Sequence, residues 1–205
     1  MMRANRPSQV ELWRSAFGRE YTDRNDHEKP ERVASWRRLL EGTAPKRVIE
    51  VGCNVGWNLE YLRRLGIDEL YGIDPQTYAV SRARARNPIF NVLHATGFDL
   101  PFRDGFFDLS FTSGVLIHIA PEAIGAALDE MYRVSRRYIV AIEYGVPKQE
   151  ELEVLYRGKQ TPLWKRDYGA LWMKRFPDLH CVRSLELTVA DGYDDCTAHL
   201  LEKKD

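Results

Sequence analysis

Hydrophobic and polar positions alternate with two different periods between residues 45 and 145. Short apolar runs bounded by polar or glycine-containing turns predict strands, and apolar residues three or four positions apart predict helices. The predicted strands are 46–51, 69–74, 90–94, 106–112 and 137–143, and the predicted helices are 57–65, 77–86 and 121–134. Strands that alternate with helices in this way indicate a parallel sheet with helices on both faces.

The alternation stops after residue 145, where residues 146–178 are polar with interspersed aromatic side chains. Two further strands are predicted at about 180–188 and 195–202, and they suit an antiparallel hairpin added to the edge of the sheet. The predicted fold class is therefore α/β, with a Rossmann-like, seven-stranded, mainly parallel sheet, helices on both faces and a C-terminal antiparallel hairpin.

The segment before the first strand contains two predicted helices. Residues 8–21 place Val10, Trp13 and Phe17 on one helical face, and a polar loop separates them from a second helix over 28–42. The aromatic side chains of the first helix have two interpretations. They pack in the core, or they form a lid over a ligand at the mouth of the sheet.

Composition limits the classes of function. Basic and acidic residues number 30 each, so the net charge gives no argument for a nucleic-acid or membrane partner. The three cysteines lie far apart without CxxC spacing, so we expect neither a metal site nor disulfides, and a cytoplasmic location. The N-terminus lacks the apolar core of a signal peptide, and no apolar run approaches the roughly 20 residues of a membrane span.

The stretch Val48-Ile-Glu-Val-Gly-Cys-Asn-Val-Gly-Trp-Asn-Leu59 reads as a strand, a tight turn and a helix. A phosphate-binding P-loop ends in Gly-Lys-Ser/Thr, and this turn contains no lysine. A dinucleotide site needs G-x-G-x-x-G, but Trp57 stands where the third glycine permits close packing. The remaining class of ligand is S-adenosylmethionine, which has no pyrophosphate. Glu50 at the end of the first strand suits its cationic methionine moiety, and Asp74 at the end of the second suits its ribose hydroxyls.

Glu50-Val-Gly-Cys-Asn-Val-Gly resembles the E/D-x-G-x-G-x-G motif of class I S-adenosylmethionine-dependent methyltransferases, with Asn54 in place of the middle glycine. Asn tolerates left-handed backbone better than most residues, so the substitution is compatible with the turn. Leu100-Pro-Phe-Arg-Asp-Gly-Phe-Phe-Asp-Leu is similar to the family's segment before the fourth strand. A narrower resemblance, to methyltransferases associated with pseudaminic acid biosynthesis, rests on Leu12–Asn25, Gly52–Leu59, Ser113–Pro121 and Tyr156–Tyr168.

The resemblance implies S-adenosyl-L-methionine as cofactor and a single methyltransferase domain over 1–205. We expect an N-terminal helical lid (1–44), a cofactor-binding core (45–145), a substrate-side insert (146–178) and the C-terminal hairpin (179–205). Thr96-Gly-Phe stands where many members have an adenine-binding Asp. The expected cofactor-binding residues are Tyr21, Asn25, Glu50, Gly52, Asn54, Gly56, Asn58, Asp74, Pro75, Thr96, Gly97, Phe98 and Ser113.

Candidate catalytic residues follow the fourth and fifth strands, whose ends face the same mouth of the sheet. His118 has an ordinary pKa near neutrality and suits a general base, or it bonds backbone at a helix start. Glu143 and Tyr144 end the fifth strand, where Glu143 suits an acceptor ammonium, a base or an ordinary strand-end carboxylate. The expected substrate-binding residues are Trp13, Tyr156, Arg157, Lys165 and Arg166, of which the basic ones suit an acidic acceptor or form a solvated face.

These observations predict transfer of a methyl group to oxygen or nitrogen of a small metabolite, such as a sugar or nucleotide-sugar-like acceptor. Two alternatives are non-methylating sulfonium chemistry on the cofactor itself and an inactive cofactor-binding partner protein. A nucleic-acid acceptor ranks lower, because the chain lacks the Asn/Asp-Pro-Pro-Tyr/Phe signature and is not basic overall. We expect a small-molecule acceptor, no nucleic acid, no membrane, and a monomer or homodimer.

Overall fold

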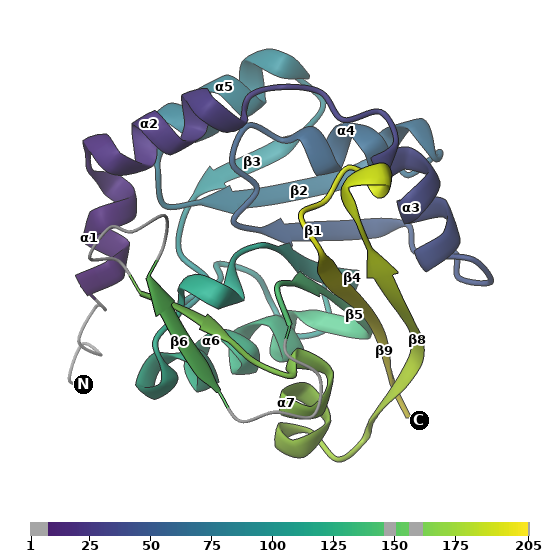
Figure 1. The fold of residues 1–205 in the computed structure, drawn as a ribbon. Coiled ribbons are helices and arrows are strands. Elements are labelled where there is room, and N and C mark those ends of the chain that lie inside the picture. The colour runs from purple at the N-terminus through teal and green to yellow at the C-terminus, as the bar shows by residue number, and fades with distance from the viewer. Residues whose placement is uncertain (1–7, 146–150, 156–161, 205) are drawn as a thin grey trace.

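A seven-stranded sheet with the strand order β3-β2-β1-β4-β5-β9-β8 forms the centre of the molecule (Figure 1). The computed structural model describes residues 8–145, 151–155 and 162–204. The strands are β1 (Arg47–Val51), β2 (Glu69–Asp74), β3 (Asn91–His94), β4 (Phe107–Ser113), β5 (Ser135–Glu143), β8 (Leu179–Leu187) and β9 (Cys196–Lys203). The first five are parallel, and β9 is antiparallel to both β5 and β8. The predicted fold class is confirmed.

Helices cover both faces of the sheet because successive side chains on each strand point to opposite sides. Val48 packs in the core beneath α3 (Arg32–Leu39), α4 (Trp57–Arg64) and α5 (Thr77–Arg86). Its neighbour Ile49 packs in the opposite core, beneath α6 (Pro121–Val134) and α7 (Tyr168–Arg175). The long apolar runs predicted as strands are therefore buried on two sides.

Strand β1 lies between β2 and β4, so the chain order reverses beside it. In such a sheet the loops after the two strands at the reversal diverge and leave a crevice for a ligand. The loops here still touch at one point, because a Cβ on Gly52 after β1 would lie 2.6 Å from Cγ2 of Val115 after β4. Glycine is required there by this approach and by its φ of +80°.

The N-terminal segment differs from the single helix expected over 8–21. It forms α1 (Ser8–Arg14) and α2 (Ala16–Asn25), with Ser15 as the N-cap of the second helix. The Ser15 Oγ accepts from the Phe17 N–H at 3.2 Å, which offers the backbone an alternative to continued helix. Gly18 lies inside α2, where a Cβ would meet the Trp13 carbonyl at 1.8 Å. The second helix, expected over 28–42, is confined to α3.

The segment after β5 contains regular structure that the hydrophobic pattern does not predict. Strands β6 (Leu152–Leu155) and β7 (Pro162–Lys165) form a separate antiparallel pair, and α7 follows them. Asp167 caps α7 by accepting from the Ala170 N–H at 2.9 Å. Four-residue strands are too short to show a period, which explains the missed prediction.

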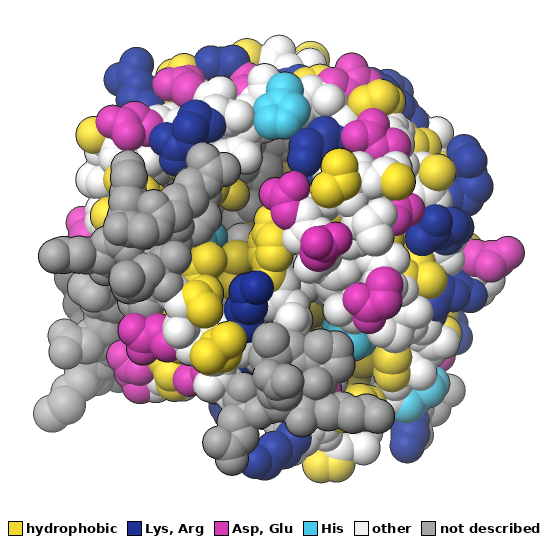
Figure 2. All heavy atoms as spheres, in the orientation of Figure 1, with side chains coloured by type: hydrophobic (Ala, Val, Ile, Leu, Met, Phe, Trp, Pro, Cys, Tyr) yellow, Lys and Arg dark blue, Asp and Glu magenta, His cyan; other side chains and the backbone are white. Residues whose placement is uncertain are grey.

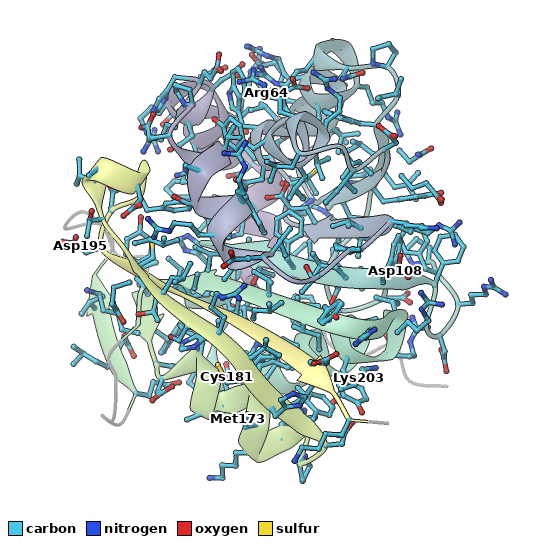
Figure 3. All side chains as sticks on the ribbon, turned by 90° about the vertical axis from the view of Figure 1, so that its right-hand side faces the viewer. Arg64, Asp108, Met173, Cys181, Asp195 and Lys203 are labelled. Atoms are coloured by element: carbon cyan, nitrogen blue, oxygen red, sulfur yellow. The ribbon has the colours of Figure 1, made fainter. Side chains whose placement is uncertain are left out.

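The C-terminal hairpin continues the sheet beyond β5, as predicted. Figure 3 shows β8 and β9 crossing the face of the molecule, with Asp195 at the connection between them and Cys181 and Lys203 at the opposite end near Met173 of α7. A short 3₁₀ helix, η3 (Val189–Asp191), lies in the connection. It packs beside α3, where Arg38 pairs with Asp191 at 3.1 Å. This ion pair links the β8–β9 connection to α3, the helix that precedes β1.

Trp36 is the side chain that joins α3 to the sheet. It is fully buried and meets Phe111 of β4 edge-on, with ring centroids 4.8 Å apart. We predict that Trp36→Ala lowers the free energy of unfolding by about 3–5 kcal/mol, because it removes this packing and leaves a cavity. Urea denaturation measures the change. Val189→Ala, at a side chain that is 74% exposed, is the control and should stay within about 0.5 kcal/mol of wild type.

Candidate functional site

A cavity of about 500 Å³ opens at the carboxyl ends of β1, β2 and β4. Small-molecule sites are typically roughly 300–1,000 Å³, so its size suits such a ligand. Figure 2 shows the hollowed face, where hydrophobic, basic and acidic side chains all border the opening. Residues from α2, the glycine turn, the ends of β2 and β4, β7 and the β8–β9 connection line it. Distant parts of the chain therefore meet at the edge that the sequence predicts.

The glycine turn is fixed to the end of β2 by backbone hydrogen bonds. The N–H groups of Gly52 and Cys53 both donate to the Ile73 carbonyl, at 2.8 and 2.9 Å. Asn54 has the left-handed φ of +45°, as its tolerance of that region predicts, and its N–H donates to Asp74 Oδ2 at 2.9 Å. Asp74 Oδ1 accepts from the Gln76 N–H at 2.8 Å. The Asp74 carboxylate is thus oriented before any ligand binds.

Glu50 is the most deeply buried acid of the cavity, at 1% exposure. Asn58, one turn into α4, donates to Glu50 Oε1 at 2.6 Å. Burial raises the pKa of Glu50 to about 8, against the opposing effect of this bond. Burial also raises the pKa of Asp74 to about 6, against its two backbone bonds. For both carboxyl groups the cost of burial outweighs the nearby hydrogen bonds and charges, and no ion pair to either occurs among the described residues.

Several buried polar atoms of the cavity have no hydrogen-bond partner among the described residues. They are Glu50 Oε2, Asn54 Oδ1, Asn58 Oδ1 and the Tyr193 hydroxyl. Native proteins rarely leave such groups unsatisfied, because each costs free energy when buried without a bond. The two amide oxygens can only accept, and Glu50 Oε2 accepts once the carboxyl is ionised, so the cavity suits a ligand that brings hydrogen-bond donors.

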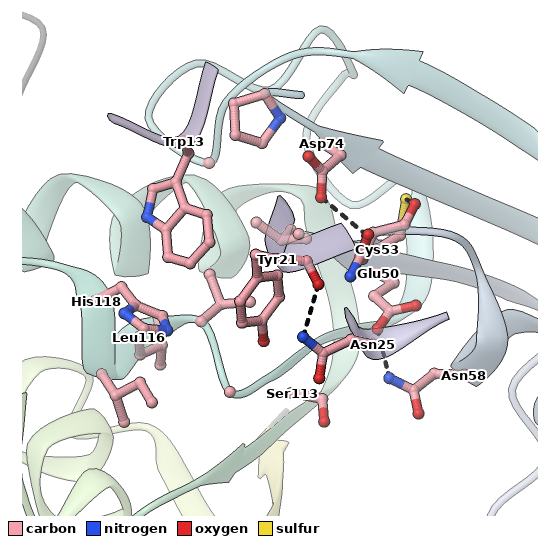
Figure 4. Close-up of a pocket in the computed structure, with 18 of the residues that line it drawn as sticks. Trp13, Tyr21, Asn25, Glu50, Cys53, Asn58, Asp74, Ser113, Leu116 and His118 are labelled. Carbon is pink, nitrogen blue, oxygen red and sulfur yellow. Dashed lines mark hydrogen bonds between the residues drawn. The ribbon is translucent and has the colours of Figure 1, made fainter. Parts of the chain in front are cut away.

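An aromatic wall faces these polar groups from the other side of the cavity (Figure 4). The Trp13 ring meets Tyr21 and His118 edge-on, with centroid distances of 5.0 and 4.7 Å. Burial lowers the pKa of His118 to about 3, so the imidazole is neutral at physiological pH. The near-neutral pKa expected for a general base is not found, because the aromatic wall excludes the water that would stabilise the imidazolium.

The N-terminal helices are fastened over the cavity at both ends. Gln76 Nε2 donates to the carbonyls of Trp13 and Ser15, at 3.0 and 3.1 Å. After α2, Asp26 pairs with Arg82 and Arg86 of α5 and accepts from Trp57 Nε1 at 3.1 Å. The Arg86 guanidinium lies 3.7 Å from the centroid of the Trp57 ring. Trp57, whose place in the motif argues against a dinucleotide, thus serves as an anchor for this segment.

The structure brings most of the predicted site residues to the cavity. Those that line it are Trp13, Tyr21, Asn25, Glu50, Gly52, Asn54, Asn58, Asp74, Pro75, Thr96, Gly97, Phe98, Ser113, His118, Tyr144 and Lys165. Gly56 lies beneath the turn rather than in the wall, with a φ of +80° and with Ala83 and Phe90 packed against its Cα. Tyr156 and Arg157 lie outside the described residues.

Glu143 and Arg166 differ from the expectation that they face a substrate. Both are buried, at 1% and 5% exposure, and neither lines the cavity. Glu143 accepts from three backbone N–H groups of the turn after β4, and Arg166 donates to two of its carbonyls. They lie behind the wall because the turn that carries His118 passes in front of them.

Sequence reasoning missed a group of cavity residues with charged or polar side chains: His27, Lys29, Arg32, Tyr193, Asp194 and Cys196. Arg32 donates from Nε to the Gly192 carbonyl at 2.9 Å, and its guanidinium lies 4.0 Å from the Tyr193 ring centroid. The Tyr61 hydroxyl accepts from the Lys29 N–H at 2.7 Å. These contacts join residues about 30 to 160 positions apart, so no local pattern marks them.

Comparison with known proteins identifies the domain. Residues 49–138 match the family described as Methyltransferase domain. The tRNA U34 carboxymethyltransferase of Trichlorobacter lovleyi is 34% identical over 91 residues, which cover 40% of this chain and 28% of that protein. The enzyme of the same name from Shewanella woodyi is 28% identical over 166 residues, covering 72% of this chain and 49% of that one. The chain thus spans less than half the length of these relatives.

Among solved structures, the 1,6-didemethyltoxoflavin-N1-methyltransferase of Burkholderia thailandensis, with bound S-adenosylhomocysteine, superposes with a TM-score of 0.75. It is 16% identical, and the alignment covers 100% of this chain and 94% of that one. The chain carries a class I S-adenosylmethionine-dependent methyltransferase domain. The predictions of this domain class and of S-adenosylmethionine as its cofactor are confirmed.

The residues present fit this cofactor. S-Adenosylmethionine carries an ammonium and two ribose hydroxyls as donors, and the cavity of the methyltransferase domain offers oriented or unpartnered carboxylate and amide oxygens. Among residues 8–145, 151–155 and 162–204, no group of three metal-ligating side chains occurs. Within the same part of the chain, no helix has the length and hydrophobicity to cross a bilayer.

The raised pKa of Glu50 makes the stability of the unliganded protein depend on pH. Its ordinary value is 4.5 and its folded value is about 8, so between these limits the folded state holds a proton that the unfolded state has lost. The free energy of unfolding therefore falls as pH rises through this window. We predict that Glu50→Gln flattens the decline, measured by urea denaturation between about pH 5 and pH 8. Glu122→Gln, at an exposed site on α6, should preserve the slope.

Proposed function

We propose that the chain transfers a methyl group from S-adenosylmethionine to an oxygen or nitrogen atom of a small, sugar-like acceptor. One observation carries the proposal. The same cavity has buried acceptor oxygens at one end and an aromatic wall with a neutral imidazole at the other (Figure 4). The first end suits the cofactor and the second suits a compact acceptor presented to it.

In this proposal Asp74 accepts from the two ribose hydroxyls, and Glu50 with Asn58 accepts from the methionine ammonium. Charge-assisted bonds of this kind are roughly twice as strong as neutral ones. The ammonium also supplies the positive charge that the Glu50 carboxylate lacks, so binding lowers its pKa and releases a proton. Thr96, Gly97 and Phe98 border the adenine, and the glycine turn of Gly52, Asn54 and Gly56 passes beneath the cofactor. Tyr21, Asn25, Pro75 and Ser113 complete its surroundings.

The cofactor's carboxylate needs a cation at the Glu50 end of the cavity. Arg32 is electrostatically coupled to Glu50, and its guanidinium is fixed by the Gly192 carbonyl and the Tyr193 ring. No further hydrogen bond of its Nη groups occurs within the described part of the chain. We assign Arg32 to the carboxylate, with Lys29 beside it. A planar guanidinium suits a carboxylate because it presents two parallel donors.

The acceptor's place lies between Trp13, Tyr21, His118, Tyr144 and Lys165. Aromatic rings suit the apolar face of a sugar ring, and Lys165 suits an anionic substituent such as a phosphate or carboxylate. When bound, the cofactor supplies a methyl group made electrophilic by the positive sulfur. The protein's task is then to hold the acceptor atom in line with that methyl group. At a pKa of about 3, His118 is neutral and accepts a hydrogen bond from an acceptor hydroxyl. It takes the hydroxyl proton only as the C–O bond forms and the S–CH3 bond breaks, because the methylated oxygen is then a far stronger acid than the free hydroxyl.

The N-terminal helices act as the lid in this proposal. Trp13, Tyr21 and Asn25 of these helices line the cavity. Their anchors at Gln76 and Asp26 keep the lid closed over the glycine turn. A closed lid excludes water, which strengthens every electrostatic contact inside.

A small acceptor is favoured over the tRNA named for the relatives. Among the described residues on the face shown, basic and acidic side chains are interspersed around the opening (Figure 2). The total charge of the chain is zero. Nucleic-acid binding normally relies on a clustered positive surface that neutralises phosphates. The narrower resemblance to methyltransferases associated with pseudaminic acid biosynthesis supports a sugar or nucleotide-sugar-like acceptor.

The direct test is to incubate the protein with isotopically labelled S-adenosylmethionine and a panel of sugars, amino acids and nucleotide sugars, and to follow products by mass spectrometry. We expect one labelled methyl group on a small acceptor. Asp74→Asn is the matched inactive control, and Asp68→Asn, at an exposed site before β2, should leave turnover intact. Breakdown of the cofactor without an acceptor would indicate sulfonium chemistry instead. Tight binding with no turnover on any acceptor would indicate an inactive partner protein.

The carboxylate assignment has a separate test. We predict that Arg32→Met weakens S-adenosylmethionine binding by about 10- to 100-fold. This range corresponds to the free energy that one or two hydrogen bonds to a charged group contribute. Binding of decarboxylated S-adenosylmethionine should hardly change, because it lacks the group that Arg32 holds. Titration calorimetry measures both affinities. Arg38→Met, at an exposed arginine of the same helix, is the control. Equal losses for the two ligands would show that Arg32 only supports the fold.

A further inference from the structure

The turn after β4 carries His118 to the cavity but has little internal structure of its own. It consists of a single 3₁₀ turn, η1 (Leu116–His118), closed by bonds of 3.0 Å from His118 N to the Val115 carbonyl and 3.1 Å from Ile119 N to the Leu116 carbonyl. The N–H groups at the start of such a turn have no partner within it. Something outside the turn must therefore fix its geometry.

Glu143, the last residue of β5, satisfies those N–H groups. Its Oε1 accepts from Val115 N at 3.1 Å and from Leu116 N at 3.0 Å, and its Oε2 accepts from Ile117 N at 3.3 Å. Three backbone donors on one buried carboxylate are a strong constraint, because bonds to a charged group are stronger than neutral ones. Both carboxylate oxygens are engaged by the turn rather than by the cavity.

Arg166 donates hydrogen bonds to carbonyl groups of the same turn. Its Nη1 donates to the Leu116 carbonyl at 3.3 Å and its Nη2 donates to the Ile119 carbonyl at 3.0 Å. Its Nε pairs with Glu151, just before β6. A guanidinium buried to 5% exposure needs all its donors satisfied, and two of the three partners here are backbone atoms of the turn.

The two side chains come from neighbouring backbone. Gly145, two residues after Glu143, forms an isolated parallel bridge with Arg166. The turn is thus held from one side by a negative group on its N–H atoms and by a positive group on its carbonyl atoms. Neither group lines the cavity. Burying two charges costs free energy, and their hydrogen bonds to the turn offset part of that cost.

We propose that Glu143 and Arg166 are positioning residues that hold the turn Gly114–Ala120 so that the His118 imidazole lies against Trp13 at the acceptor end of the cavity. The imidazole then stays dry and neutral. We call Glu143 and Arg166 together the clamp. A wall residue misplaced by about 1 Å can lower a transfer rate by roughly 100-fold, so the clamp affects the rate by holding His118 in place.

Arg166 also links this turn to the β6–β7 hairpin. Lys165 lines the cavity while Arg166, its neighbour, reaches the turn behind the wall, so the chain here presents one cation to each side. An acceptor that binds Lys165 therefore contacts the same strand end that fixes His118. Only this link to the acceptor rests on the proposed function, whereas the clamp itself rests on the geometry.

The test follows the His118 ring by NMR in protein labelled at histidine, with His118→Asn to assign its signal. In the wild type with S-adenosylhomocysteine, we expect a signal shifted by the Trp13 ring that does not titrate near neutral pH. In Glu143→Gln and Arg166→Met the signal should move toward its exposed position, and the pKa of His118 should rise toward its ordinary value of about 6.5. The affinity for S-adenosylhomocysteine should stay within about twofold, because neither side chain lines the cavity.

Matched controls are Glu153→Gln, at an exposed acid of β6, and Arg136→Met, at an arginine whose side chain is 69% exposed. Both should leave the His118 signal unchanged. Should Arg166→Met fail to fold, Arg166→Lys retains one donor and should give an intermediate shift. An unaltered His118 signal in both folded clamp variants, or a loss of cofactor affinity as large as the change at His118, overturns the proposal. The His118 signal is measured without an acceptor. If no acceptor is found in the methyl-transfer assay, the NMR result can therefore still be interpreted.

Discussion

The end of the cavity that contains Glu50 depends on the burial of its carboxyl group, for which Arg32 is the only charge that lowers the pKa and no ion pair occurs among the described residues. Burying a charge unpaired is costly, and the protein answers by favouring the protonated form, which raises the pKa to about 8. Glu50 is buried because β1 is central in the sheet and because α4 and the β8–β9 connection close over its end. The strand order therefore creates an acid that is satisfied only when a positive group enters.

A second buried carboxylate, Glu143, shows that burial alone does not mark a binding group. Burial raises its pKa to about 7, in the same direction as for Glu50. The difference lies in the partners. Glu143 has both oxygens bonded to the turn after β4, whereas Glu50 has one oxygen bonded to Asn58 and one without a partner among the described residues. The hydrogen bonds of each carboxyl oxygen therefore distinguish Glu50, which has an oxygen free for a ligand, from Glu143, whose two oxygens bind the backbone of the turn.

Much of the fold was predictable from the sequence because its signals are local. The apolar run before Gly52 and the run before Asp74 each lie within one strand, and their burial on two faces makes them easy to recognise. The placing of Glu50, Asn54 and Asp74 at one end of the cavity was predictable for the same reason, since all three lie at fixed places around these strands. The break of the first helix was not, because the apolar spacing of Val10, Trp13 and Phe17 continues across Ser15, whose side chain caps a second helix.

The opposite, aromatic end of the cavity is assembled from four separate parts of the chain, and its Asp194 was not predicted although Trp13, His118 and Lys165 were. Trp13 comes from α1, His118 from the turn after β4, Lys165 from β7 and Asp194 from the β8–β9 connection. The glycine-turn motif includes none of these four residues, and contacts that fix their surroundings, such as Arg166 to the Ile119 carbonyl, join positions 47 residues apart. This division has a physical consequence. The end of the cavity with Glu50 and Asp74 is built from the ends of β1 and β2 within the sheet, whereas α1, β7 and the β8–β9 connection are added around it. A change in acceptor therefore requires changes only in those added parts, and they are the parts in which the acceptor's identity must be sought.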